Sequence, residues 1–145
     1  MAPVIAHLPS GDQHAVLAAL RGYLAEVARA LRTGLESCAV DPGPPLSACV
    51  GLDGRLPGYP GRDFALLWDE VHGWAIAVET HSGEDFIVLR YLGGGTVTPP
   101  PAELLGFVTA LREDDHRIGQ LAPPALRSVG SSAELDTLLR LRGVT

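Results

Sequence analysis

The sequence predicts an α+β fold: an antiparallel meander of about five strands, with a long N-terminal helix and two C-terminal helices packed on the sheet. Apolar residues recur at helical spacing over 11–32, large apolar residues alternate along 63–92, and two helix-start signals follow residue 92. The 145 residues fit a single domain, since about 100–200 residues per domain is usual. We expect residues 1–9 to form a tail and the proline-containing residues 116–130 to connect the last two helices.

The first helix is predicted over residues 11–32. Ser10 and Gln13 have the spacing of a capping box, in which the Ser hydroxyl accepts a free backbone N–H and the Gln side chain reaches back. Gly34 is expected to end the helix, because glycine is favoured in the left-handed conformation that follows a helix. The apolar stripe consists of Val16, Leu17, Leu20, Tyr23, Leu24, Val27 and Leu31.

Two short strands are predicted next, over 35–40 and 46–52, with the proline-rich break 41–45 between them and a Gly/Pro-rich loop at 53–62. Cys38 and Cys49 lie on these strands. Their register is not fixed by the sequence, so whether the two thiols are close stays open. We expect both to be reduced and to act as small buried apolar residues.

The stretch 63–92 predicts three further strands. Pairing through the turn at 69–73 places Trp68 opposite Trp74, Leu66 opposite Ile76 and Phe64 opposite Val78. Pairing through 81–84 places Val78 opposite Ile87, Ile76 opposite Leu89 and Trp74 opposite Tyr91. Both registers gather the large residues on one face, as a buried sheet face requires. The second face, with Val88 and with Arg90 across from Ala75, is also partly apolar, so we expect a helix, a partner subunit or a ligand to cover part of it.

Two helices are predicted in the C-terminal third. The prolines at 99–101 open the first, because proline is tolerated where no N–H partner exists. This helix is expected to stop at Asp114 and Asp115, whose charges oppose the helix dipole. Ser131 and Glu134 form a second capping box before a short helix that ends at Gly143.

The composition excludes several functions. All 11 basic residues are Arg, so lysine chemistry such as Schiff-base formation is absent, and there is no Asn. The formal net charge of −6 argues against nucleic acid and anionic membranes as partners, because both repel an acidic protein. The N-terminus lacks the basic region of a signal peptide, and no apolar run reaches the about 20 residues needed to span a bilayer. We therefore expect a soluble cytoplasmic protein.

Polar residues cluster at the hairpin ends. Asp69 and His72 lie in one predicted turn, and Glu79 and His81 project from the same face of the following strand, near Glu84 and Asp85. Such a carboxylate and imidazole can form an acid/base pair or bind a metal. No metal-binding spacing accompanies them, so ordinary solvated turns are the favoured interpretation, and we expect neither metal nor cofactor.

Other candidate residues have similar alternatives. Arg90 can clamp a carboxylate or phosphate, but an ion pair with Asp69 or extension to an edge is favoured. Trp68 and Trp74 can stack on a ligand, although an opposed aromatic pair in a hairpin is more often core. His7, His14 and His116 have no ligand spacing.

Four segments resemble a family of small actinobacterial proteins of unknown function: GLDGRLPG (51–58), LLWDEVHGWAIAVET (66–80), GED (83–85) and PPPAE (99–103). The resemblance covers about residues 13–112, and the tryptophan hairpin is its most specific part. It implies a high-GC actinobacterial source, in agreement with the missing Lys and Asn, and it transfers no activity or catalytic residue.

Two functions stay open at this point. The first is a binding protein without a catalytic motif that uses the second sheet face, with Val88, to hold a protein partner or a second copy of itself. The second is a small-molecule-binding protein or a cofactor-independent acid/base isomerase or cyclase of specialised metabolism, with Glu79, His81 and Arg90 around a pocket.

Overall fold

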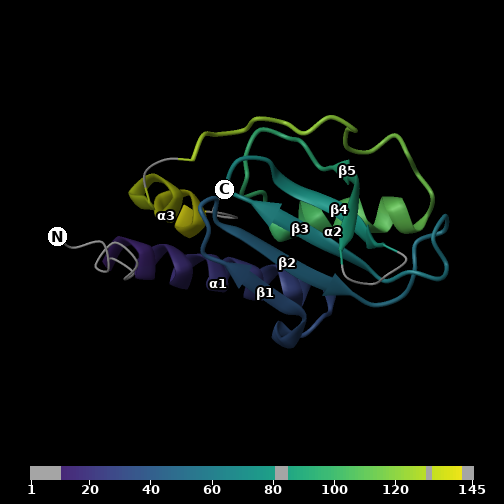
Figure 1. Cartoon of the computed structure of the whole chain (residues 1–145), viewed down its shortest axis with the longest axis horizontal. Coiled ribbons are helices and arrows are strands. Elements are labelled where there is room, and N and C mark those ends of the chain that lie inside the picture. The colour runs from purple at the N-terminus through teal and green to yellow at the C-terminus, as the bar shows by residue number, and fades with distance from the viewer. Residues whose placement is uncertain (1–10, 81–84, 130–131, 142–145) are drawn as a thin grey trace.

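Five strands form one antiparallel sheet in which neighbours in the chain are neighbours in space (Figure 1). The strands are β1 (Cys38–Asp41), β2 (Ser47–Leu52), β3 (Phe64–Asp69), β4 (Gly73–Glu79) and β5 (Phe86–Tyr91). The computed structural model describes residues 11–80, 85–129 and 132–141. The predicted α+β meander is confirmed, whereas the predicted tail, the 81–84 turn and the Ser10 and Ser131 caps lie outside the described residues.

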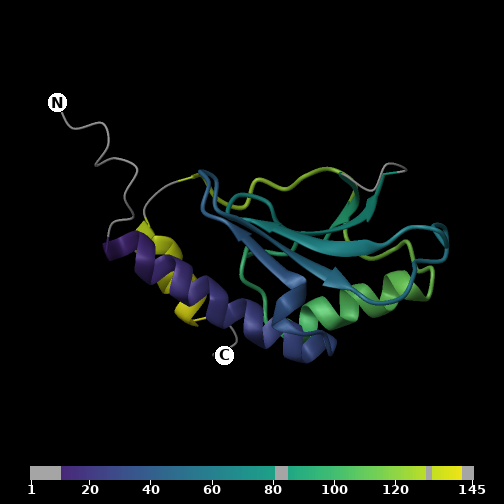
Figure 2. The same cartoon turned by 60° about the horizontal axis from the view of Figure 1, so that its bottom comes forward.

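The α-helices of the described residues lie on the same side of the sheet, as Figure 2 shows. They are α1 (Gly11–Leu31), α2 (Pro101–Arg112) and α3 (Ser132–Leu141). Most of the predicted stripe of α1 is buried, with Leu20, Tyr23 and Val27 each 0% exposed, and Leu17 and Leu31 at its margins are partly buried. Leu104 and Phe107 of α2 are equally buried. Since burial of one such side chain contributes about 1.5–3 kcal/mol, these stripes fix the helices to the sheet.

The sheet residues that face the helices are the large ones. They are Val50 and Leu52 of β2, Phe64, Leu66 and Trp68 of β3, and Trp74, Ile76 and Val78 of β4. The registers Trp68↔Trp74, Leu66↔Ile76 and Phe64↔Val78 agree with the sequence prediction. We call this side the inner face and the opposite side the outer face.

Both indole N–H groups find buried acceptors in the core. Trp68 Nε1 donates to the Val97 carbonyl at 2.7 Å. Trp74 Nε1 donates to the Tyr23 hydroxyl at 3.0 Å, which in turn donates to the Pro99 carbonyl at 2.6 Å. Trp68 is thereby hydrogen-bonded directly to the segment that leads into α2, and Trp74 is connected to it through Tyr23 of α1. Both tryptophans are structural core residues.

A β-bulge in β5 overturns part of the predicted register. Val78 pairs with Ile87 as predicted, but Ala77 pairs with Val88 and Ile76 with Arg90, which leaves Leu89 as the extra residue. Because successive strand residues alternate between faces, one extra residue exchanges the faces of all that follow. The predicted opposition of Ile76 to Leu89 and of Trp74 to Tyr91 is therefore wrong. Arg90 lies on the inner face and Tyr91, paired with Ala75, on the outer face.

Two local boundaries also differ from the prediction. The residue after α1 with a left-handed backbone is Arg32 (φ 58°), not Gly34, and the Thr33 N–H closes the helix end on the Ala28 carbonyl at 2.9 Å. Residues Leu35–Ser37 form a single 3₁₀ turn, η2, before β1 begins. Asp114 has φ 61°, so α2 ends at the predicted position.

Candidate functional site

The outer face of the sheet is largely apolar, and none of the described helices covers it (Figure 2). The register places its residues in rows across the strands. One row is Ala39, Cys49, Leu67, Ala75 and Tyr91; the next is Gly51, Ala65, Ala77 and Val88. The middle of this face is therefore floored by small side chains, and its larger side chains lie along β5.

A hollow of about 370 Å³ lies over the first of these rows and extends to Asp41, Ser47 and Asp69 at one end of the sheet. Val88 of β5 lines it and is 37% exposed, and Phe86, two residues earlier on the same strand, is 39% exposed. The floor alanines Ala65, Ala75 and Ala77 are only 0–3% exposed, so the exposed apolar surface of this face lies along β5. Exposed apolar patches beside a hollow often mark interaction surfaces.

Carboxylates lie at both ends of the outer face. Asp41, Ser47 and Asp69 form the row at one end, and Glu79 pairs with Phe86 at the other. Arg55, which lies near Glu79, is bound by Asp63 at 2.8 Å. The four rows defined here contain no Arg side chain, so the apolar centre is flanked by negative charge.

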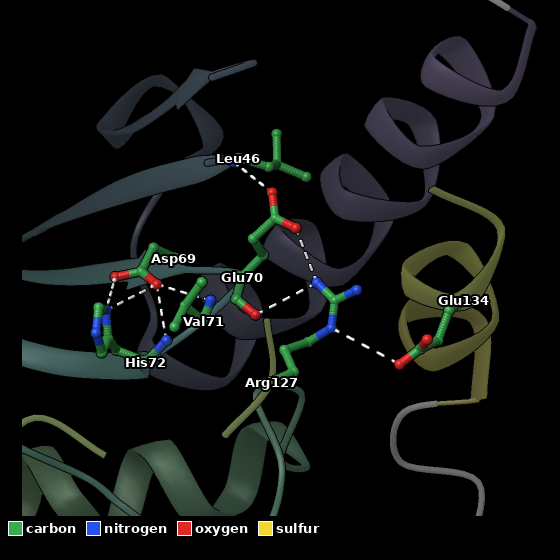
Figure 3. A network of polar contacts seen from close by, with 7 residues as sticks. All are labelled: Leu46, Asp69, Glu70, Val71, His72, Arg127 and Glu134. Carbon is green, nitrogen blue, oxygen red and sulfur yellow. Dashed lines mark hydrogen bonds and ion pairs between the residues drawn. The ribbon is translucent and has the colours of Figure 1, made fainter. Parts of the chain in front are cut away.

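The β3–β4 turn holds Asp69 and His72 in a fixed arrangement (Figure 3). Asp69 Oδ1 accepts the backbone N–H groups of Val71 and His72 at 2.8 and 2.7 Å. His72 Nδ1 lies 3.0 Å from Asp69 Oδ2, and the His72 ring packs 6.2 Å from the Tyr91 ring. The Asp69 carboxylate thus stabilises the turn by accepting its backbone N–H groups. No hydroxyl or thiol of the described residues completes a nucleophilic triad with Asp69 and His72.

Glu70 points the other way from the same turn and is buried, which the sequence analysis missed (Figure 3). Its Oε2 accepts the Leu46 N–H at 2.6 Å and its Oε1 lies 2.9 Å from Arg127 Nη1. Both side chains are 8% exposed. Arg127 Nε has no hydrogen-bond acceptor and lies 4.0 Å from a carboxylate oxygen of Glu134 in α3. This cluster connects the turn to the segment before α3 and has a structural role.

The structure separates the residues of the predicted small-molecule site. Glu79 lies on the outer face, and Arg90 lies on the inner face, because of the bulge at Leu89. The predicted ion pair of Arg90 with Asp69 is absent; Arg90 Nε donates to the Ile118 carbonyl at 2.7 Å instead. His81 lies outside the described residues.

The two cysteines are unbonded and lie on opposite faces of neighbouring strands. Cys38 pairs with Val50 on the inner face, and Cys49 pairs with Ala39 on the outer face. Burial raises the pKa of both thiols, and the neighbouring Cys38 adds to the effect on Cys49. Both are therefore poor nucleophiles near neutral pH.

The described residues hold no group of three or more His, Cys, Asp or Glu side chains arranged to bind a metal. Within the same residues, no helix has the length and apolarity needed to cross a bilayer.

A family model described as a family of unknown function (DUF6292) matches residues 23–110, from the second half of α1 to the last turn of α2. This range includes the whole sheet. No curated protein and no solved structure matches the chain.

Proposed function

Because the chain belongs to the DUF6292 family of unknown function, we propose its function from the outer face: it is a binding protein that takes up an amphipathic helix of a partner protein there. The observation that carries this proposal is the apolar hollow of about 370 Å³ on a sheet face that no described helix covers. Helices bind such grooves through an apolar stripe, whose side chains enter the hollow.

Charge favours a different protein as the partner over a second copy of this chain. Both ends of the outer face carry carboxylates, represented by Asp69 and Glu79. Two copies packed face to face would bring acidic ends together in either orientation, and like charges across an interface are unfavourable. A partner helix with Lys or Arg at both ends of its apolar stripe has the complementary charges.

The size of the sheet sets the length of this helix. β2, β3 and β5 each have six residues, which corresponds to about 20 Å at about 3.3 Å per residue. A helix that crosses this distance along the strands needs about 13 residues. The basic residues of the partner are thus expected about 13 positions apart.

Two synthetic helical peptides test the proposal. They share one leucine stripe and differ only in having Lys or Glu at both ends. In amide chemical-shift mapping, the Lys peptide is expected to shift Cys49, Leu67 and Val88 and to bind more tightly than the Glu peptide. Equal binding of both peptides, shifts confined to the helices, or a stable dimer in sedimentation would refute the proposal.

Matched variants sharpen the result. Val88→Asp places a charge in the apolar hollow and is expected to abolish binding, whereas Val129→Asp changes another exposed valine, 51% exposed, away from this face and leaves binding unchanged. Glu79→Gln is expected to weaken binding of the Lys peptide, while Glu103→Gln, in the first turn of α2, has no effect.

An actinobacterial source and a cytoplasmic location stay predictions. The absence of Lys and Asn from the sequence supports the former, and the genome that encodes the chain tests it directly.

A further inference from the structure

A second cavity lies on the inner side of the sheet, away from the outer face. It has a volume of about 380 Å³ and opens between the loop 53–63, β4, β5 and the C-terminal end of α2. Its apolar wall consists of Leu56, Ile76, Leu89, Leu111 and Leu121. At about 30 Å³ per water molecule, the space corresponds to about 12 waters, and it lies within the usual range of small-ligand sites.

Arg90 is the cationic side chain that the bulge turns into this cavity. Bulges often re-aim one side chain beside a functional site. The Arg90 Nε is held by the Ile118 carbonyl at 2.7 Å, which fixes the guanidinium group. None of the carboxylates among the described residues forms an ion pair with it at 4.0 Å or less, so the half-buried guanidinium group has no anionic partner there.

The carboxylate of Asp114 also lines the cavity, but it already contacts the ring of His116. Its Oδ1 lies 2.6 Å from His116 Nε2, and these two side chains are 63% and 70% exposed at the rim. Because both side chains are largely exposed, solvent screens the charge of this carboxylate. Arg90 is therefore the charged group set deepest against the apolar wall.

We propose that this cavity binds a small amphipathic monocarboxylate, whose carboxylate is hydrogen-bonded by Arg90. The hydrocarbon part of this ligand lies against Ile76, Leu89 and Leu111. The planar guanidinium group suits a carboxylate because it donates two parallel hydrogen bonds. The apolar wall accounts for the rest of the ligand, and Tyr59 of the loop closes one side. This site is independent of the outer-face proposal.

Three probes of equal chain length test the site on the native protein: hexanoate, hexanol and hexylamine, followed by amide chemical-shift titration. Hexanoate is expected to shift Tyr59, Leu89 and Ile118 and to bind about tenfold or more tightly than hexanol, the gain typical of a charge-assisted hydrogen-bonded pair. Hexylamine should bind most weakly. Equal binding of the three probes, or shifts only on the outer face, would overturn the proposal without any variant.

The variant test uses Arg90→Gln, which removes the charge and keeps a polar side chain. It is expected to lower hexanoate affinity about tenfold and to leave hexanol affinity unchanged. Arg29→Gln on α1, which removes the same charge from an exposed position, is the matched control and should change neither. Unchanged hexanoate binding in a folded Arg90→Gln protein would refute the assignment, and should that variant not fold, the comparison of the three probes still decides.

Discussion

Replacing Arg127 by Met is expected to destabilise the protein strongly, because it leaves the buried carboxylate of Glu70 without its cationic partner. Glu70 and Arg127 are each only 8% exposed and are joined at 2.9 Å. Removing one member of such a pair costs about 3–5 kcal/mol. The Leu46 N–H still donates to Glu70 at 2.6 Å in the variant, so we expect the lower end, about 3 kcal/mol.

The neutral double variant separates the charge effect from lost packing. Glu70→Gln keeps an oxygen for the Leu46 N–H and is expected to cost about 2 kcal/mol by leaving Arg127 without its nearest carboxylate. In Glu70→Gln/Arg127→Met neither charge is stranded, so the total should be about 3 rather than 5 kcal/mol, an interaction energy of about 2 kcal/mol.

Urea denaturation followed by fluorescence of the buried Trp68 and Trp74 measures these differences. In thermal unfolding of a chain of this length, a loss of about 3 kcal/mol in the free energy of unfolding corresponds to a Tm lower by about 10 °C. Arg140→Met is the control, since its partner Asp136 lies in a surface pair at 2.8 Å and such pairs contribute about 0–1 kcal/mol. A loss in Arg127→Met no larger than in this control, or additive losses in the double variant, would refute the reasoning.

Three further predictions concern the core, a turn and a thiol. Tyr23→Phe deprives the Trp74 N–H of its acceptor and is expected to cost about 3 kcal/mol in the same assay, a loss below about 1 kcal/mol counting against it. A Cβ at Gly73 (φ +72°) would lie 3.2 Å from a methyl of Leu126, whereas a Cβ at Gly94 (φ +77°) would meet no atom within 4 Å. Gly73→Ala should therefore lower the free energy of unfolding more than Gly94→Ala. Equal losses in the two variants would contradict this argument from crowding. Because the pKa of Cys49 is raised above 9.0, its thiolate forms only at higher pH, so its alkylation by iodoacetamide, mapped by peptide mass spectrometry, should keep rising above pH 9 instead of reaching a plateau.

The sequence predicted the central hairpin well because its signal is local. Trp68 and Trp74 flank a turn of fixed length, and the alternation on both strands allows only one register with a single buried face. The end of α2 was equally local, since the helix stops where acidic residues meet its negative end.

The bulge at Leu89 could not be predicted from the strand pattern. Ile87, Leu89 and Tyr91 alternate as in a regular strand, so the sequence favours an unbroken register. The structure instead pairs Tyr91 on its other side with Gln120, through backbone hydrogen bonds of 2.8 Å in both directions. Gln120 lies about 30 residues after Tyr91 in the chain, and no residue pattern near Leu89 indicates this pairing.

The buried pair of Glu70 and Arg127 was missed for a related reason. Glu70 stands among Asp69, Val71 and His72 in a turn, where polar residues are normally solvated. Its burial depends on Arg127, 57 residues later in the chain. The side chains of Asp69 and His72 stay partly exposed, at 29% and 39%, whereas the side chain of Glu70 between them is only 8% exposed.

The extra residue at Leu89 also bears on how relatives of this chain should be compared. In a homologue that lacks this residue, β5 would pair with β4 without a bulge, and its arginine would still lie opposite the equivalent of Ile76 on the inner face. A homologue of equal length whose β5 pairs without a bulge would instead place that arginine opposite the equivalent of Ala75, on the outer face. Equal length in an alignment therefore does not establish that two relatives place this arginine on the same face of the sheet.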